Sequence, residues 1–465
     1  MMRKNESNKK HRFRLKIEVL FCFIFFFVAI ACNEGNKEEV NPYDKPHRPS
    51  LPVIVNGIGP TEGGLGTRVV VNGDNFGNDP SKIGLYFNDK KALILKAQDN
   101  AIYAMVPKQP GEYSTIRVEV EGKESVLDDV KFKYFIRATV TTVAGVWNVS
   151  ANPPVDGPAL EATFFRPTKV AVDDDGNVLV ADDQSGARIR LISMQENRMS
   201  TVLRMSVPWS CMFNEQFTHF YVMERNAGQR PTLFYSLSKE SGYMESEMFF
   251  DQRDEGGSYI FGSYTACGFA VDDTYVYMMS ENGTRFIRVH QVNKTVELIG
   301  SNITGMGTYT HMVYNKKDGM IYMSLEASGR LMRFNPHHTP PGRTTPWITW
   351  DDMEWIVGTG VVSPSISREG NGRDAQLGTL CGLGADHDGN IYICDQRFHC
   401  VWKVDPLLNC TVFAGPPAGP IVLGYRDGKP EEALFNRPYD ITATYDGLIY
   451  VADTYNFVVR CISIQ

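Results

Sequence analysis

Short apolar segments separated by Gly, Asn, Asp and Pro run along most of the chain, and long stretches with a helical period are hard to find. Residues 115–120 alternate strictly between polar and apolar side chains, as a strand with one buried face does. Residues 67–71, 84–87 and 101–106 are further segments of strand length. The 26 Phe, 21 Tyr and 6 Trp favour strands as well, so the pattern predicts an all-β protein.

One unit of this pattern recurs beyond residue 136: an apolar strand, an Asp-Gly turn, and a second apolar strand that ends on Asp. Clear copies lie at residues 174–182, 386–395 and 445–453, and weaker ones around residues 217–221, 272–277 and 318–323. The second strands end at Asp182, Glu224, Ser280, Leu325, Asp395 and Asp453, at intervals of 42 to 70 residues. This spacing is typical of four-stranded propeller blades, and six copies predict six blades.

A second signature lies between the blades. Ala-Gly, Asp-Gly and a segment ending in Phe-x-Arg-Pro follow one another in residues 144–167 and again in residues 414–438. Both signatures resemble the NHL-repeat family of six-bladed propellers, and the resemblance covers residues 137–465. It implies a β-propeller over this whole region.

The two ends of the propeller region predict how it closes. The last repeat stops at residue 464 without the outer strand that residues 411–415 supply to the preceding blade. Residues 140–145 have a similar sequence and stand at the start of the domain. We therefore expect this N-terminal strand to complete the sixth blade and to remove a free sheet edge.

The strands of residues 52–136 have the spacing of a small β-sandwich. An apolar strand here runs into the turn Asn72-Gly73-Asp74-Asn75-Phe76-Gly77. Further features are Gly59-Pro60, the glycines from Gly63 to Gly66, Val106-Pro107 and Phe132-Lys133-Tyr134. This order of residues resembles the IPT/TIG immunoglobulin-like family, which implies a spacer or binding module without catalytic residues. The expected fold is a small immunoglobulin-like β-sandwich followed by a six-bladed β-propeller.

The N-terminus predicts the compartment. A basic segment precedes an apolar run from Val19 to Ala31, which is too short to span a membrane but suits a signal peptide. The run ends in Ala29-Ile30-Ala31-Cys32, which resembles a bacterial lipobox with Ala29 in place of the usual Leu. The resemblance implies a signal peptide over residues 1–31 and lipidation of Cys32. A plain secretory signal is the alternative.

Residues 32–51 are expected to form a lipid anchor and tether. Lys37-Glu38-Glu39 resembles the surface-export signal of Bacteroides-type surface lipoproteins, and a solvated linker is the alternative. We therefore expect the protein on the outer membrane, held by its lipid and facing the cell exterior.

The charge of the chain excludes two classes of partner. Residues 1–31 hold seven Lys and Arg against two Glu, so the remaining chain has 40 basic and 52 acidic residues, or about −12. Nucleic acid and anionic membrane surfaces both need basic patches, so neither is expected as a partner, and the membrane contact is through the lipid anchor only.

The cysteines predict neither metal nor cofactor. Seven follow Cys32, and their spacings match no zinc pattern: Cys211, Cys267, Cys381, Cys394, Cys400, Cys410 and Cys461. Several lie inside apolar strand segments, where Cys acts as a small buried hydrophobe. A disulfide between Cys394 and Cys400 is the alternative to buried free thiols.

In each blade, the residues before the first strand and after the second strand emerge on one face. Aromatic rings stack on the apolar faces of pyranosides, and charged groups and amides bond their hydroxyls, so these positions suit a sugar. Asp182, Asp395 and Asp453 recur with the repeat and are expected to cap turns. The candidate ligand-binding residues are Arg166, Trp209, Tyr309, His311, Arg397, Arg437 and Tyr455.

Residues 336–355 form an insertion with three of the six Trp. Long insertions on propellers are often functional loops. The alternative is that these rings bury the outer strand of the fourth blade, and the sequence leaves both open.

No catalytic residue is predicted. His219, His290, His387 and His399 are scattered, and only His311 is placed for the ligand face. The chain has no Gly-x-Ser-x-Gly segment and no Ser-His-Asp arrangement. We therefore expect non-catalytic binding of an extracellular polysaccharide or oligosaccharide, delivered to an outer-membrane glycan transporter complex. The alternatives are a propeller hydrolase or lyase acting on a sugar or lactone, and a protein-interaction scaffold.

Overall fold

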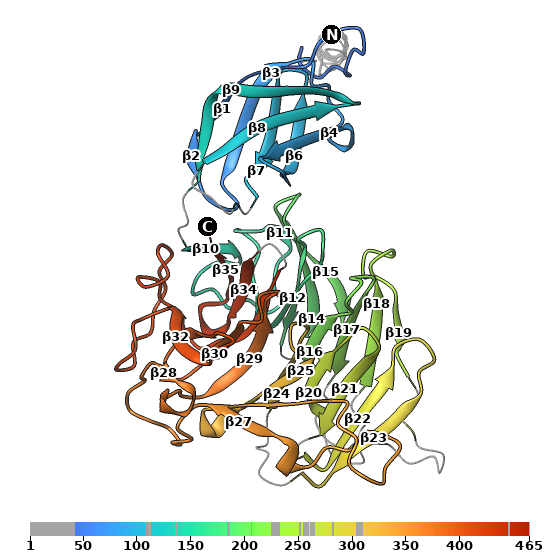
Figure 1. Ribbon diagram of the computed structural model, residues 1–465, viewed down its shortest axis with the longest axis vertical. Coiled ribbons are helices and arrows are strands. Elements are labelled where there is room, and N and C mark those ends of the chain that lie inside the picture. The colour runs from blue at the N-terminus through green and yellow to red at the C-terminus, as the bar shows by residue number, and fades with distance from the viewer. Residues whose placement is uncertain are drawn as a thin grey trace, which may run out of the picture. The chain divides into compact units, whose positions relative to one another are not determined.

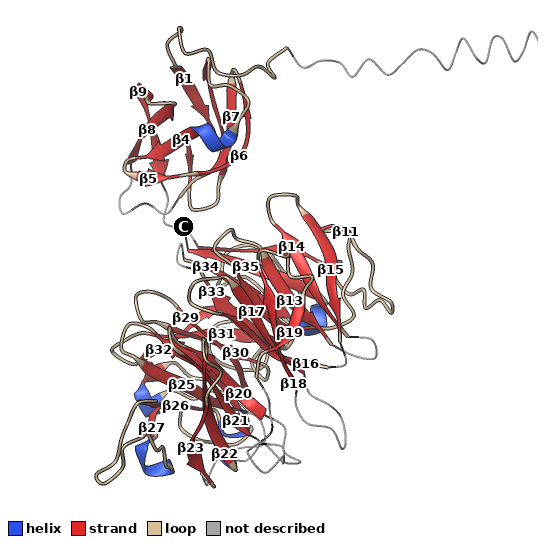
Figure 2. Cartoon of the chain, turned by 90° about the vertical axis from the view of Figure 1, so that its right-hand side faces the viewer, coloured by secondary structure: helices blue, strands red, loops and turns tan. Residues whose placement is uncertain are grey.

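The computed structural model describes residues 42–107, 109, 113–134, 138–183, 187–205, 207–224, 233–250, 253, 260, 266–280, 283–303, 310–444 and 447–464. Over these residues the chain consists of β-strands, loops and a few short 3-10 turns (Figure 2). Within the same ranges, no helix has the length and hydropathy of a membrane span. The predicted signal peptide, Cys32 and the export signal lie outside the described residues.

The first domain is a sandwich of two sheets (Figure 1). One sheet has the order β1 (Ile54–Gly59), β3 (Arg68–Asp74), β7 (Ala101–Met105) and β6 (Leu93–Gln98). The other has the order β2 (Glu62–Gly63), β9 (Lys123–Tyr134), β8 (Tyr113–Val120), β4 (Ile83–Phe87) and β5 (Lys90–Lys91). The alternation predicted for residues 115–120 is confirmed in β8, where Ile116, Val118 and Val120 are buried.

Six further sheets follow, as the six copies of the repeat predict (Figure 1). The first contains β11 (Gly157–Pro158), β12 (Pro167–Val172), β13 (Val178–Asp182), β14 (Arg188–Ser193) and β15 (Arg198–Arg204). The second contains β16 (Pro208–Phe213), β17 (His219–Glu224), β18 (Leu233–Ser238) and β19 (Ser246–Met248). The third contains β20 (Ala266–Val271), β21 (Tyr275–Ser280), β22 (Arg285–His290) and β23 (Val296–Ser301).

The fourth sheet contains β24 (Thr310–Asn315), β25 (Met320–Leu325), β26 (Arg330–Phe334) and β27 (Glu354–Val357). The fifth contains β28 (Gly370–Asn371), β29 (Leu380–Ala385), β30 (Ile391–Asp395), β31 (Cys400–Val404) and β32 (Asn409–Ala414). The sixth contains β33 (Pro438–Ala443), β34 (Leu448–Asp453), β35 (Val458–Ile464) and β10 (Ala138–Ala144). We call these sheets blades one to six.

The first strands of the blades form a ring. Going round it, β12, β16, β20, β24, β29 and β33 each lie against the next, and β33 lies against β12. In the sixth blade, β10 pairs antiparallel with β35, with Val140 opposite Ile462. The amide of Val140 also donates to the carbonyl oxygen of Gly428 at 2.7 Å. Strands from both ends of the propeller region thus lie in one sheet.

The insertion before β27 packs against its own blade. Ile348 is fully buried and its amide donates to the carbonyl oxygen of Ile299 at 2.6 Å. Trp350 and Trp355 pack against the buried cluster between the third and fourth blades, and the indole of Trp355 donates to the carbonyl oxygen of Gly358. Of the two roles that the sequence left open for these rings, this packing favours the burial of the outer strand.

The described cysteines are free and buried, in agreement with the thiols expected from the sequence: Cys211, Cys381, Cys394, Cys400, Cys410 and Cys461.

Candidate functional site

Three aspartates at the ends of second strands hold the loops of one face in place. The carboxylate of Asp182 accepts hydrogen bonds from the amides of Phe165 and Arg166 at 2.9 and 2.6 Å. The carboxylate of Asp395 accepts from the amide of Gly378 at 2.8 Å, and that of Asp453 from the amide of Asn436 at 2.8 Å. The predicted capping role of these aspartates is therefore confirmed. We call this end of the propeller the loop face.

A buried donor on the third strand completes each of these caps. Arg190 lies 3.5 Å from Asp182, Arg460 lies 2.9 Å from Asp453, and the indole of Trp402 donates to Asp395 at 3.0 Å. All three donors are fully buried. Glu224, Ser280 and Leu325 end the second strands of the other blades. Only one of them is acidic, which explains why those copies of the repeat are weak in sequence.

Arg437 and Tyr455 form a contact on the loop face in blade six. Arg437 precedes β33 and is exposed, and its guanidinium lies 4.9 Å from the ring centre of Tyr455. The ring of Tyr455 is 43% exposed. The amide of Arg437 donates to Nδ1 of His399 at 2.9 Å, which requires a neutral imidazole at that position. Burial, with a smaller effect of Arg437, lowers the pKa of His399 to about 4.

Arg397 lies on the same face in blade five. Its amide donates to Asp395, and its Nε donates to the carbonyl oxygen of Pro364 at 2.5 Å. Among the described residues, neither Arg397 nor Arg437 has a carboxylate within salt-bridge distance. Arg166 differs from both, because its guanidinium forms an ion pair with Asp183.

Trp147 is a candidate that the sequence reasoning missed. Its ring is 53% exposed and stacks on Tyr425 with a centroid separation of 5.2 Å. The amide of Asn148 donates to the carbonyl oxygen of Asn456 at 3.2 Å, which brings Trp147 close to Tyr455. The sequence did hold a signal for this site, because Trp147 lies in a connection that leads to the first strand of a blade.

The other predicted residues are dispersed. Trp209 is half-buried and packs against the cluster formed by blades two and three. Tyr309 lies outside the described residues. His311 is buried and faces the centre of the propeller rather than the loops. The structure thus brings Arg437 and Tyr455 into contact, places Arg397 on the same face in the neighbouring blade, and leaves Trp209 and His311 apart from them.

Three polar side chains lie at one level of the central channel. Lys169 pairs with Ala181, His311 with Ser324, and Asp440 with Ala452, in each case one residue before the end of the second strand. Nζ of Lys169 lies 2.9 Å from Nδ1 of His311 and 3.8 Å from the carboxylate of Asp440. Sequence reasoning missed Lys169 and Asp440, although both stand three residues after the Arg of an Arg-Pro signature.

The electrostatics of this group follow from its burial. Burial first, and the charge of Lys169 second, lower the pKa of His311 well below its usual range. Because Lys169 donates to Nδ1, the proton of the neutral imidazole is assigned to Nε2. Nε2 has no hydrogen-bond partner among the described residues. Burial raises the pKa of Asp440, and the charge of Lys169 opposes this effect.

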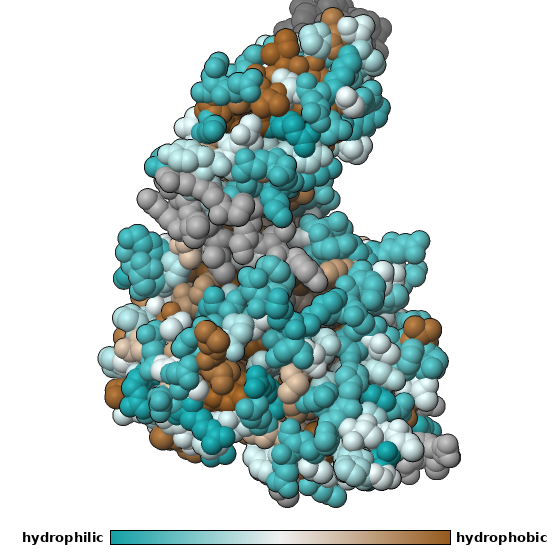
Figure 3. All heavy atoms as spheres, in the orientation of Figure 1, coloured by the Kyte–Doolittle hydropathy of each residue, from teal (hydrophilic) through white to brown (hydrophobic). Residues whose placement is uncertain are grey.

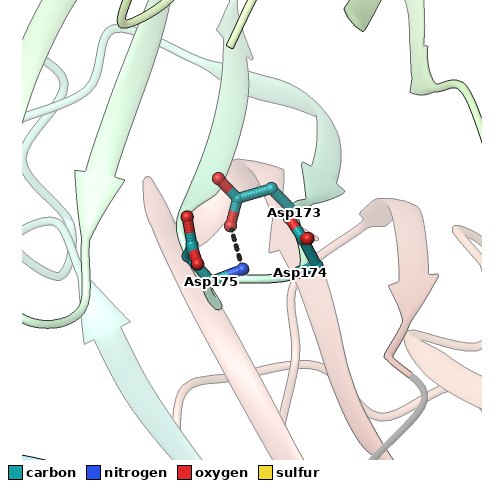
Figure 4. Close-up of side chains that lie close together, drawn as sticks. All are labelled: Asp173, Asp174 and Asp175. Carbon is teal, nitrogen blue, oxygen red and sulfur yellow. Dashed lines mark hydrogen bonds between the residues drawn. The ribbon is translucent and has the colours of Figure 1, made fainter. Parts of the chain in front are cut away.

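The only group of acidic side chains with metal-ligand spacing in the described part of the chain lies away from the loop face. Asp173, Asp174 and Asp175 form the turn between β12 and β13, at the opposite ends of these strands (Figure 4). Asp173 accepts from the amide of Asp175 at 3.0 Å and from the hydroxyl of Tyr243 at 2.7 Å. The ammonium of Lys239 forms ion pairs with all three carboxylates. These contacts give the group a structural role in the turn, with one cation offsetting part of its negative charge.

Comparisons with known proteins bear on both domains. Residues 52–134 match the IPT/TIG domain family. A curated relative, Protein SUPPRESSOR OF QUENCHING 1, chloroplastic, from Arabidopsis thaliana, is 35% identical over 89 residues. That match covers 19% of this chain and 8% of the relative, so the chain spans a small part of the length of the curated relative it matches.

Solved structures resemble the chain over 90% of its length. A structural genomics protein of unknown function from Bacteroides thetaiotaomicron is 26% identical, with a TM-score of 0.61 and 99% of its own chain covered. Auxiliary nutrient binding proteins from Bacteroides thetaiotaomicron and Bacteroides ovatus are each 20% identical, with TM-scores of 0.57 and 99% of their chains covered. These likenesses show that the fold is shared.

Proposed function

We propose that the loop face of the propeller binds an extracellular glycan without cleaving it, and that the protein passes this nutrient to an outer-membrane transporter complex. The observation that carries the proposal is the exposed ring of Tyr455 beside the guanidinium of Arg437, together with a second exposed ring, Trp147, whose neighbour Asn148 donates its amide to the carbonyl oxygen of Asn456. Exposed rings beside charged donors suit a sugar, whose apolar face stacks and whose hydroxyls accept hydrogen bonds. The auxiliary nutrient binding proteins of the same fold support a nutrient as the ligand.

The absence of cleavage is part of the proposal. On the loop face, three of the four acidic groups at the ends of the second strands are occupied by backbone amides: Asp182, Asp395 and Asp453. His399 is fixed as a hydrogen-bond acceptor of a backbone amide through Nδ1. Glycoside hydrolysis needs a pair of available carboxyl groups at a defined separation, and these occupied groups do not offer one.

The cell-surface location is also a proposal. It is supported by the lipobox-like Ala29-Ile30-Ala31-Cys32 and by the acidic Lys37-Glu38-Glu39 that follows. We expect labelled palmitate to be incorporated into the wild-type chain and not into Cys32→Ala. Protease added to intact cells should degrade the wild-type protein, and protection of the protein would contradict surface exposure.

The test of glycan binding is affinity electrophoresis of the full-length protein through gels that contain single polysaccharides, with chromatography of each mixture. We expect retardation by at least one polysaccharide and no new reducing ends or unsaturated products. Products would instead make the protein a hydrolase or lyase. Tyr103→Ala serves as the control, because this ring is 36% exposed on β7 of the sandwich domain.

Protein binding is a second candidate, and the apolar side chains of two loop-face connections favour it. Val362 is 65% exposed and Ile366 53%, in the connection between β27 and β28, and Leu423 is 54% exposed before β33. The two connections meet in a bridge between Ile366 and Pro420. Brown patches interrupt the mostly hydrophilic surface of the propeller in the view of Figure 3. If this is the function, Val362→Asp should remove a co-purifying outer-membrane protein that Arg437→Gln leaves bound.

A further inference from the structure

Three contacts and the chain neighbours of the residues that make them link the fifth and sixth blades on the loop face. Arg397 stands two residues before His399, and Nδ1 of His399 accepts from the amide of Arg437. The guanidinium of Arg437 lies over the ring of Tyr455. Next to Tyr455, Asn456 accepts from the amide of Asn148, the neighbour of Trp147. We call the series Arg397, His399, Arg437, Tyr455 and Trp147 the loop-face arc.

The arc carries positive charge that the described residues do not neutralise. Arg397 uses its Nε for the carbonyl oxygen of Pro364, and Arg437 contacts a ring, so both guanidiniums keep further N–H donors. His399 adds no charge near neutral pH, since its pKa is about 4. This positive excess stands out in a chain whose formal net charge is −7.

Three acidic side chains within residues 395–453 already have other partners. Asp395 is fully buried and accepts from the amide of Gly378 and the indole of Trp402. Asp453 is fully buried and pairs with Arg460. Asp427 forms a further ion pair with Arg460 at 2.6 Å. These carboxylates therefore serve buried donors, and the guanidiniums of the exposed Arg437 and the half-buried Arg397 remain for a ligand.

We propose that the glycan bound by this face is acidic, and that Arg397 and Arg437 bind the carboxylates of its uronic acid residues while Tyr455 and Trp147 stack on its rings. This inference rests on the proposed function and specifies its substrate class. Guanidinium matches carboxylate with two parallel hydrogen bonds, which a neutral sugar cannot accept in the same way. Two guanidiniums followed by two exposed rings along one arc fit a chain molecule better than a single monosaccharide.

The experiment compares each acidic polysaccharide with its own carboxyl-reduced form, which keeps the backbone and linkages and removes the charge. The probes are polygalacturonate, alginate and hyaluronan, together with free galacturonate and glucuronate, titrated against the full-length protein. We expect at least one acidic polymer to bind about tenfold or more tightly than its reduced form, the size of one charge-assisted hydrogen bond. The free sugars should bind more weakly than that polymer.

Substitutions within the loop-face arc test whether its arginines cause the preference for the acidic polymer. Arg437→Gln and Arg397→Gln should each weaken binding of the acidic polymer about tenfold and reduce the salt dependence of binding. Arg437→Lys, which keeps the charge and loses the bidentate geometry, should lie between Arg437→Gln and the wild type. Arg198→Gln is the matched control, because Arg198 is exposed at the opposite end of the first blade. Equal melting temperatures confirm that the variants are folded.

Three results would overturn the inference, and they differ in what they say of the proposed function. Equal binding of acidic and carboxyl-reduced forms, unchanged in Arg437→Gln, would refute the acidic substrate class and leave glycan binding in place. Retardation by neutral polysaccharides alone would do the same. Failure to bind any polysaccharide, acidic or neutral, would refute both the inference and the proposed function.

Discussion

Lys169 of the first blade reaches His311 of the fourth blade, with 2.9 Å between Nζ and Nδ1. In the ring of first strands, β16 and β20 separate β12 from β24 on one side, and β29 and β33 separate them on the other. A contact between these two residues must therefore cross the central channel. Lys169 is 3% exposed and His311 is 6% exposed, so this contact, which we call the Lys169–His311 bridge, lies inside the propeller.

The bridge predicts that Lys169→Met is strongly destabilising. Asp440 would remain buried without its nearest cation, and breaking a buried pair in this way costs about 3–5 kcal/mol. The measurement is the free energy of unfolding in guanidinium chloride. The double variant Lys169→Met, Asp440→Asn removes both charges and should recover a large part of the loss. Lys429→Met, whose side chain is 67% exposed, is the control and should change stability little.

His399 predicts how stability depends on pH. Its pKa is about 4 in the folded protein and about 6.5 in an unfolded chain, so the unfolded chain binds more protons between these values. Stability should therefore fall as the pH falls from about 6.5 to 4, with about 3 kcal/mol from this residue. His311 acts in the same direction, since its pKa is lowered too.

Comparing the wild type with His399→Gln isolates the contribution of His399 to the pH dependence of stability, because the other titrating groups affect both proteins equally. The difference in unfolding free energy between the wild type and the variant should shrink as the pH falls toward 4. A difference that stays constant over this range would contradict the neutral, amide-accepting state of His399.

The pairing of β10 with β35 predicts that the start of the propeller region is needed for its stability. Val140 is fully buried between Ile462 and the connection at Gly428, so Val140→Asp would bury an uncompensated charge. We expect a loss of about 3 kcal/mol or more, or failure to fold, measured by thermal and chemical unfolding. Thr141→Asp, at the adjacent exposed position, is the control. Equal stability of the two variants would contradict the role of β10.

The two exposed rings of the loop-face arc predict how much ring stacking contributes to glycan affinity. Tyr455→Ala and Trp147→Ala should each weaken glycan binding about tenfold, measured by titration calorimetry, because each removes an exposed ring from the loop-face arc. Tyr455→Phe keeps the ring and should bind within about twofold of the wild type. If Tyr455→Phe lost as much affinity as Tyr455→Ala, the hydroxyl rather than the ring would be the binding group.

Local features of the fold could be predicted from the sequence because their causes are local. Asp182, Asp395 and Asp453 cap turns within about 20 residues of themselves, and the turn chemistry is visible in each clear repeat. The pairing of residues 138–144 with the last strand is a long-range feature that was still predictable, because the similarity to residues 411–415 identified the missing strand.

The central channel could not be predicted in the same way. Lys169 and Asp440 lie within mostly apolar strands, and their partners are defined only when the ring of blades closes. Trp209 was expected on the ligand face. Its ring packs against a cluster that includes residues of the neighbouring blade, and its own segment of sequence does not reveal that packing. Trp147 was missed because its exposure depends on the path of a long connection.

The most direct test of the account is a crystal structure of the protein with an oligosaccharide from the polysaccharide that retards it most. The account predicts an uncleaved oligosaccharide on the loop face, with one sugar ring against Tyr455 and its polar groups bonded to Arg437. A cleaved sugar at this place, or an intact sugar bound elsewhere on the molecule, would contradict it.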